Sequence, residues 1–141
     1  QMSDEMKSIF QGLNARGKMI LPEAATEEQI AAFEKEHAVE LPKEYKEWLL
    51  CTDGGELFLP GGIQFYGVAH KPIIDVDYND RPGSDYTVIG ALAMGDPILC
   101  EKSTSQISIY NHEAGTIEPD EIYPDFLAFL QDIDSILGIG G

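Results

Sequence analysis

The stretch that decides the fold reads Leu41-Pro42-Lys43-Glu44-Tyr45-Lys46-Glu47-Trp48-Leu49-Leu50, and Thr52-Asp53-Gly54-Gly55 follows one residue later. Tyr45, Trp48 and Leu49 have the i, i+3, i+4 spacing of an apolar helix face, and lysines and glutamates fill the opposite face. Pro42 is tolerated in the first turn of a helix. A glycine in the left-handed conformation commonly follows a helix end, so the glycine pair is expected to stop this helix. We predict a short helix with one buried aromatic face.

Two more helices are expected before this stretch. Thr26-Glu27-Glu28-Gln29 is a capping box, which predicts a helix that starts after Thr26 and runs towards His37. Apolar residues also recur at helical spacing between Ser3 and about Leu13, which predicts a short helix there.

The C-terminal segment carries the strongest amphipathic pattern of the chain. Phe126, Phe129, Leu130, Ile133 and Leu137 follow the spacing i, i+3, i+4, i+7, i+11. This pattern predicts one long C-terminal helix that ends at a glycine, residue 138.

Between these helical segments the pattern changes to short apolar runs separated by turn residues. Strands are expected over residues 57–59, 63–68, 87–92, 97–101, 106–110 and 116–118. Ile107 and Ile109 alternate with polar residues at period two, as in a strand with one buried face. The order of elements predicts an α+β fold: a central, mostly antiparallel sheet flanked by N-terminal helices and one long C-terminal helix.

The length and the net charge of the chain restrict the classes of function that it can have. A chain of 141 residues is the size of one domain. Nine basic and twenty-five acidic residues give a net charge of −16, which repels phosphate backbones and anionic lipid. We therefore expect no binding to nucleic acid or membrane, and a basic protein partner instead, although acidity also serves solubility alone. Cys51 and Cys100 do not make a disulfide framework, so a cytoplasmic location is expected.

The motifs of catalysis and metal binding are missing from the sequence. The segment that starts at Asp75 begins like a calcium loop, but Asp80 and Tyr86 stand where a glycine and a glutamate are needed. Cys51 and Cys100 are interpreted as buried structural cysteines, because a reactive thiol needs an exposed electropositive setting. We expect no enzyme activity, no catalytic residue, no cofactor and no metal site.

Short motifs in a fixed order resemble the SUKH superfamily, and within it the Smi/Knr-type branch named for a fungal cell-wall-assembly regulator. The N-terminal motifs are residues 25–34, 39–50 and 52–55, and the later ones are residues 63–68, 93–98, 109–113 and 126–130. The resemblance covers roughly residues 22–137. It divides the chain into an N-terminal extension with a short helix, residues 1–21, and a single Smi/Knr-like domain, residues 22–141.

The resemblance implies a protein-binding domain without catalysis. Bacterial members of this kind are implied to be immunity proteins that bind and neutralise a cognate toxin, often a nuclease. A regulatory or scaffold protein of signalling or cell-wall assembly is the alternative. A metal-dependent enzyme that uses the carboxylates of residues 75–85 is a third possibility.

A nuclease binds a phosphate backbone through a basic cleft, which an acidic partner can cover. Two acidic clusters are therefore the candidate contacts. The first acidic cluster, in a polar stretch expected to be a surface loop, consists of Asp75, Asp77, Tyr78, Asp80 and Asp85. The second acidic cluster consists of Glu118, Asp120 and Glu121. The competing interpretation is that both are solvated loops with no partner.

Overall fold

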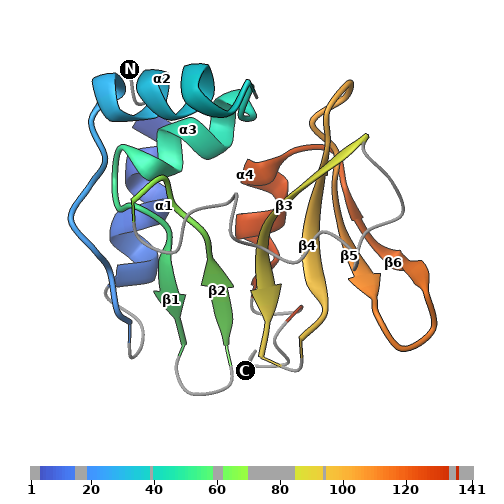
Figure 1. The fold of residues 1–141 in the computed structure, drawn as a ribbon. Coiled ribbons are helices and arrows are strands. Elements are labelled where there is room, and N and C mark those ends of the chain that lie inside the picture. Colours follow the sequence, from blue (N-terminus) through green and yellow to red (C-terminus); the bar gives the residue numbers. More distant parts are fainter. Residues whose placement is uncertain are drawn as a thin grey trace.

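The computed structural model describes residues 4–14, 19–38, 40–58, 62–69, 85–93, 95–133 and 136. Within these residues, three helices come first, then six strands and the helix α4 (Figure 1). The helices are α1 (Asp4–Asn14), α2 (Glu27–His37), α3 (Lys43–Leu49) and α4 (Phe126–Gln131). The strands are β1 (Gly55–Leu57), β2 (Ile63–Phe65), β3 (Tyr86–Leu92), β4 (Pro97–Glu101), β5 (Ile107–Asn111) and β6 (Thr116–Tyr123).

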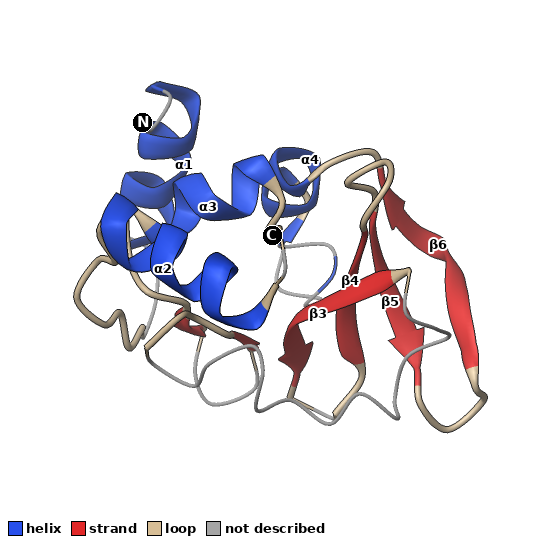
Figure 2. Cartoon of the chain, turned by 45° about the horizontal axis from the view of Figure 1, so that its top comes forward, coloured by secondary structure: helices blue, strands red, loops and turns tan. Residues whose placement is uncertain are grey.

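The six strands form one antiparallel sheet in the order β1-β2-β3-β4-β5-β6, so each strand pairs with its neighbours in the sequence. The α+β fold with an antiparallel sheet, expected from the sequence, is confirmed. Figures 1 and 2 show α1, α2 and α3 gathered near the β1 end of the sheet, with β5 and β6 farthest from them. β6 is therefore an edge strand on the side of the molecule away from these helices.

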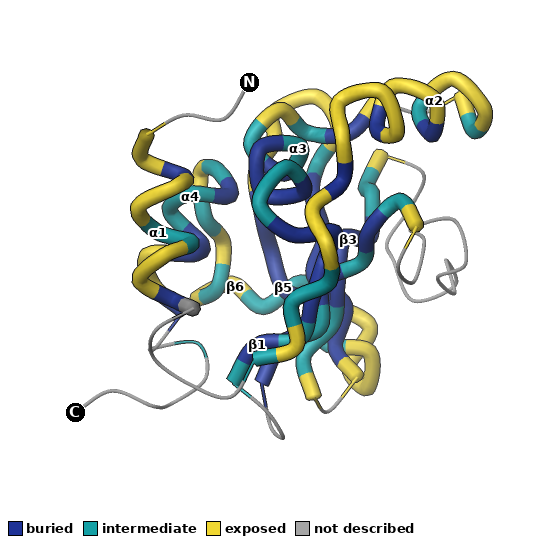
Figure 3. The backbone as a smooth tube through the Cα atoms, turned by 90° about the vertical axis from the view of Figure 1, so that its left-hand side faces the viewer, coloured by how far each residue is buried: buried dark blue, intermediate teal, exposed yellow. Residues whose placement is uncertain are grey.

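The core lies between the helices and one face of the sheet. Tyr45 and Trp48 of α3 are fully buried, which confirms the predicted aromatic face. The ring centroid of Phe65 in β2 lies 5.6 Å from that of Trp48 and 5.4 Å from that of Phe126 in α4, and both pairs have edge-to-face geometry. Such pairs add about 0.5–1.5 kcal/mol each beyond the burial of their area. Figure 3 shows exposed positions along the outer sides of α1 and α2 and buried ones within the sheet.

The glycine pair after α3 is needed for a close approach to the sheet. Gly54 has φ +92°, and a Cβ built there would lie 2.6 Å from the carbonyl oxygen of Phe65. The indole Nε1 of Trp48 donates a 2.9 Å hydrogen bond to the carbonyl oxygen of Gly54. Only glycine adopts this φ readily and has no Cβ. Glycine at this position therefore lets the turn after α3 pack closely against β2.

Helix α1 is part of the core, although it lies in the segment interpreted as an N-terminal extension. Met6 and Leu13 are buried, and α1 packs against α3 and α4. Beyond the helix, the N–H and C=O groups of Ile20 both pair with Glu56 at 2.8 Å. The chain at Ile20 therefore covers the outer edge of β1.

The predicted long C-terminal helix is wrong: α4 has six residues, Phe126–Gln131. The N–H of Asp132 bonds to the carbonyl oxygens of Phe129 and Leu130, which ends the regular i→i−4 pattern. Ile133 is nevertheless buried, and Ile136 packs against the core. The apolar spacing thus correctly marked buried positions, but the burial does not require one continuous helix. Leu137 and Gly138 lie outside the described residues.

Candidate functional site

The first acidic cluster lies almost entirely outside the part of the chain that the structure describes. Only Asp85 is placed: it is exposed, directly precedes β3, and its carbonyl oxygen accepts a 2.8 Å hydrogen bond from the N–H of Lys102. Asp75, Asp77, Tyr78 and Asp80 are outside the described residues. Asp85 lies just before β3, and two strands, β4 and β5, separate β3 from β6, which carries the second acidic cluster. With about 4.8 Å between neighbouring strands, the distance from β3 to β6 is roughly 14 Å.

The second acidic cluster lies in an irregular part of the edge strand β6. Ser108 pairs with Ile122, whereas Tyr110, two residues later on β5, pairs with Ile117. β6 therefore carries extra residues between these two pairs, which form a bulge at residues 118–121. All three carboxylates of the cluster lie in this bulge. The sequence pattern predicted a strand only over residues 116–118, whereas β6 continues to Tyr123.

The electrostatic environment of Glu121 shows how closely the carboxylates gather. Its pKa is raised, first because partial burial penalises the charged form. Negative charge adds to this effect: within the described part of the chain, the charged groups that act on Glu121 are the carboxylates of Glu118, Asp96, Asp120 and Asp132, in decreasing order. Carboxylates therefore predominate around Glu121 among the described residues, and Glu118, Asp120 and Glu121 place three of them on β6 itself.

Two of these carboxylates were not identified from the sequence. Asp96 directly precedes β4, and Asp132 caps the C-terminus of α4. Asp96 is buried beside His112, whose Nδ1 lies 2.5 Å from Asp96 Oδ1, and Asp132 accepts a 2.7 Å hydrogen bond from the hydroxyl of Tyr123. Neither spacing nor a motif connects these positions with residues 118–121, because the sheet pairing and the packing of α4 bring them together.

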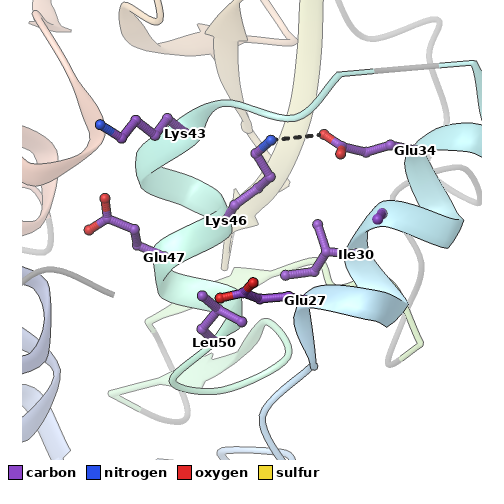
Figure 4. A pocket seen from close by; sticks show the side chains of 8 residues that line it. Glu27, Ile30, Glu34, Lys43, Lys46, Glu47 and Leu50 are labelled. Atoms are coloured by element: carbon purple, nitrogen blue, oxygen red, sulfur yellow. Dashed lines mark ion pairs between the residues drawn. The ribbon is translucent and has the colours of Figure 1, made fainter. Parts of the chain in front are cut away.

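A shallow groove lies between α2 and α3 (Figure 4). It has a volume of about 300 Å³, with Ile30 and Leu50 as its apolar part. Glu34 and Lys46 form an ion pair across it, with 3.3 Å between the carboxylate and the ammonium group. Both signs of charge line the groove, so it has no electrostatic preference comparable with that of the β6 surface.

The nucleophilic and metal-binding side chains show no catalytic arrangement in the described residues. Burial raises the pKa of the Cys51 thiol to about 11 and that of Cys100 to about 12, so both remain protonated at neutral pH. Cys100 is buried, as expected from the sequence, whereas Cys51 is only half-buried, so the expectation of a buried Cys51 was wrong. Its pKa is raised first by partial burial and then by the negative charge of Glu47. Within the described part of the chain, no group of three or more histidine, cysteine or acidic side chains could hold a metal ion.

Comparison with known families explains the order of motifs and turns. The profile of the SMI1 / KNR4 family (SUKH-1) matches residues 24–132. The chain belongs to this family. The match begins just before α2 and ends just after α4, so it spans α2, α3, the whole sheet and the second acidic cluster. Helix α1 of this SMI1 / KNR4 protein lies outside the match, although it packs in the same core.

Curated proteins give no match to the chain. Among the described residues, no helix combines the length and apolar character required to span a membrane.

Proposed function

We propose that this SMI1 / KNR4 protein is a non-enzymatic immunity protein that binds and neutralises a basic, nuclease-type toxin. Three properties support the proposal: the family, the net charge of −16, and the raised pKa of Cys51 and Cys100, which keeps both thiols protonated at neutral pH. The observation that carries it is the concentration of negative charge on β6, where carboxylates from three parts of the chain act on Glu121.

The mechanism follows from charge complementarity. A nuclease must present cationic side chains to its phosphate substrate. The β6 surface would attract that cleft over a long range, which raises the association rate and favours this partner over neutral proteins. Once bound, the protein would block access of the nucleic acid without any chemical step.

The test is a capture experiment with this protein as bait in lysate of its source cell, at low and at moderate salt. We expect a basic protein with nuclease activity, released more readily at moderate salt, whose activity falls when purified bait is added. A neutral signalling or envelope protein as the captured partner would favour the scaffold alternative and overturn the toxin proposal.

A charge variant then locates the contact. The triple substitution Glu118→Gln, Asp120→Asn, Glu121→Gln should lower the association rate with the captured toxin and flatten its salt dependence. A matched control, Glu23→Gln, Glu28→Gln, Glu36→Gln, removes the same charge from exposed positions at and before α2. If both triple variants slow association equally, net charge alone steers the partner and β6 is not the contact.

A further inference from the structure

A row of three apolar side chains and one serine crosses the face of the sheet that points away from the helices. Val88 pairs with Leu99, Leu99 with Ser108, and Ser108 with Ile122, so these four side chains cross β3 to β6 on one face. Val88, Leu99 and Ser108 are buried, and Val88 and Leu99 stand outside the hydrophobic cluster that the helices cover. Ile122 ends the row and is 43% exposed.

Two more side chains extend this face along the hairpin of β5 and β6. Tyr110 lies two residues after Ser108 and therefore on the same face, and its partner Ile117 shares that face. Both are half-buried and, like Ile122, lie apart from the helix-covered core. We call Tyr110, Ile117 and Ile122 the outer patch. The bulge with Glu118, Asp120 and Glu121 lies between Ile117 and Ile122 along the strand.

We propose that the outer patch is the anchor of the docking surface, and that its occupant is a partner segment with apolar side chains flanked by lysines or arginines. This deepens the proposed function and rests on it for the identity of the partner. One exposed and two half-buried apolar side chains next to a charged border have the anatomy of an interface centre with a polar rim. The carboxylates select a cationic partner, and burial of Ile122 slows its release.

The occupant covers the face of the hairpin and does not extend the sheet. The bulge interrupts the ladder of β6, and Pro119 within it has no N–H to donate. Bulges, prolines and charges on an edge strand are devices that prevent pairing with another strand. Recognition therefore depends on side chains, and backbone pairing along β6 contributes nothing.

A defined peptide tests the proposal without the toxin. The probe is a twelve-residue peptide that alternates lysine with valine, and its reference alternates lysine with serine, so the two carry equal charge. We expect the lysine-valine peptide to bind roughly tenfold more tightly, since burial of one apolar side chain contributes about that factor. Amide NMR shifts should map the contact to β5 and β6.

Substitutions then test whether the outer patch causes the difference in affinity between the two peptides. Ile122→Ser should abolish the tenfold preference for the valine peptide and leave the binding of the serine peptide unchanged. Ile20→Ser is the matched control, because Ile20 is 50% exposed at the opposite end of the sheet. Thermal unfolding verifies that both variants are folded.

Three results would overturn the proposal: equal affinity for both peptides, equal loss in Ile20→Ser and Ile122→Ser, or NMR shifts away from the hairpin. Concentration-dependent shifts of the hairpin without peptide would assign the patch to a second copy of the chain and also overturn it. If the peptide result holds and no toxin is captured, the docking surface stands and only the immunity function fails.

Discussion

Trp48 lies at the centre of the core, and its environment sets the effect of removing it. The ring is fully buried and its Nε1 is hydrogen-bonded to Gly54. Trp48→Ala should lower the free energy of unfolding by about 3–5 kcal/mol, measured by urea denaturation. Tyr110→Ala, which removes a half-buried ring outside the core, should cost much less. Equal costs for the two substitutions would contradict the packing around Trp48.

Asp53 is a second residue whose role depends on its burial. It is 4% exposed, and its two carboxylate oxygens accept hydrogen bonds from the N–H groups of Val68 and Ala69 at 2.8 and 2.9 Å. Asp53→Asn keeps only one of these acceptors and leaves a donor unsatisfied, so we expect a loss of about 1–3 kcal/mol in the free energy of unfolding. Asp120→Asn, at an exposed position, is the control and should cause no such loss.

At the scale of elements, helix α2 depends on its first turn. The Thr26 hydroxyl accepts from the N–H of Gln29 at 3.0 Å, and the Gln29 side chain accepts from the N–H of Thr26 at 2.8 Å. We expect Thr26→Ala to lower the free energy of unfolding by about 0.5–2 kcal/mol in chemical denaturation. Thr26→Ser retains a hydroxyl and should restore most of this stability. A Ser variant as unstable as the Ala variant would show that the cap is not the cause.

Helix α4 shows how another element supports a short helix. Its first turn is satisfied from two sides: Asp125 accepts from the N–H of Ala128 at 2.8 Å, and Glu44 of α3 accepts from the N–H of Leu127 at 3.0 Å. Burial raises the pKa of Glu44, and the hydrogen bond to Leu127 acts in the opposite direction. A helix of six residues is too short to be stable alone, so its packing against the core and these caps hold it in place.

At the scale of the whole molecule, the crowding of carboxylates makes stability depend on pH. The pKa of Glu121 is raised in the folded state by burial and by neighbouring carboxylates. Its stabilising contribution is complete below the unfolded value of 4.5 and is lost as the pH rises through the folded value. At neutral pH the ionised Glu121 therefore opposes folding.

The substitution Glu121→Gln tests this dependence. It should raise the urea midpoint of unfolding at neutral pH, and the gain should shrink as the pH falls towards 4.5. Glu113→Gln removes the same charge from an exposed turn and is the control. A gain that is equal in both variants, or independent of pH, would contradict the special position of Glu121.

The sequence by itself determined the types and order of the elements and most of the core. The capping box at Thr26 and the aromatic face of α3 are local patterns, and they hold because helix period and cap chemistry involve residues at most four positions apart. The same is true of the alternation in β5. The motifs of the SMI1 / KNR4 family were also recognisable, since they mark turns and core positions.

Only the tertiary structure decided the charge and the exposed apolar side chains of the β6 surface. The bulge at residues 118–121 follows from the pairing register with β5, which no local pattern specifies. The approach of Asp96 and Asp132 to Glu121 depends on where β4 and α4 lie. The end of α4 at Asp132 and the exposure of Ile122 follow from packing, so the charge and the apolar anchor of this surface come from contacts between distant parts of the chain.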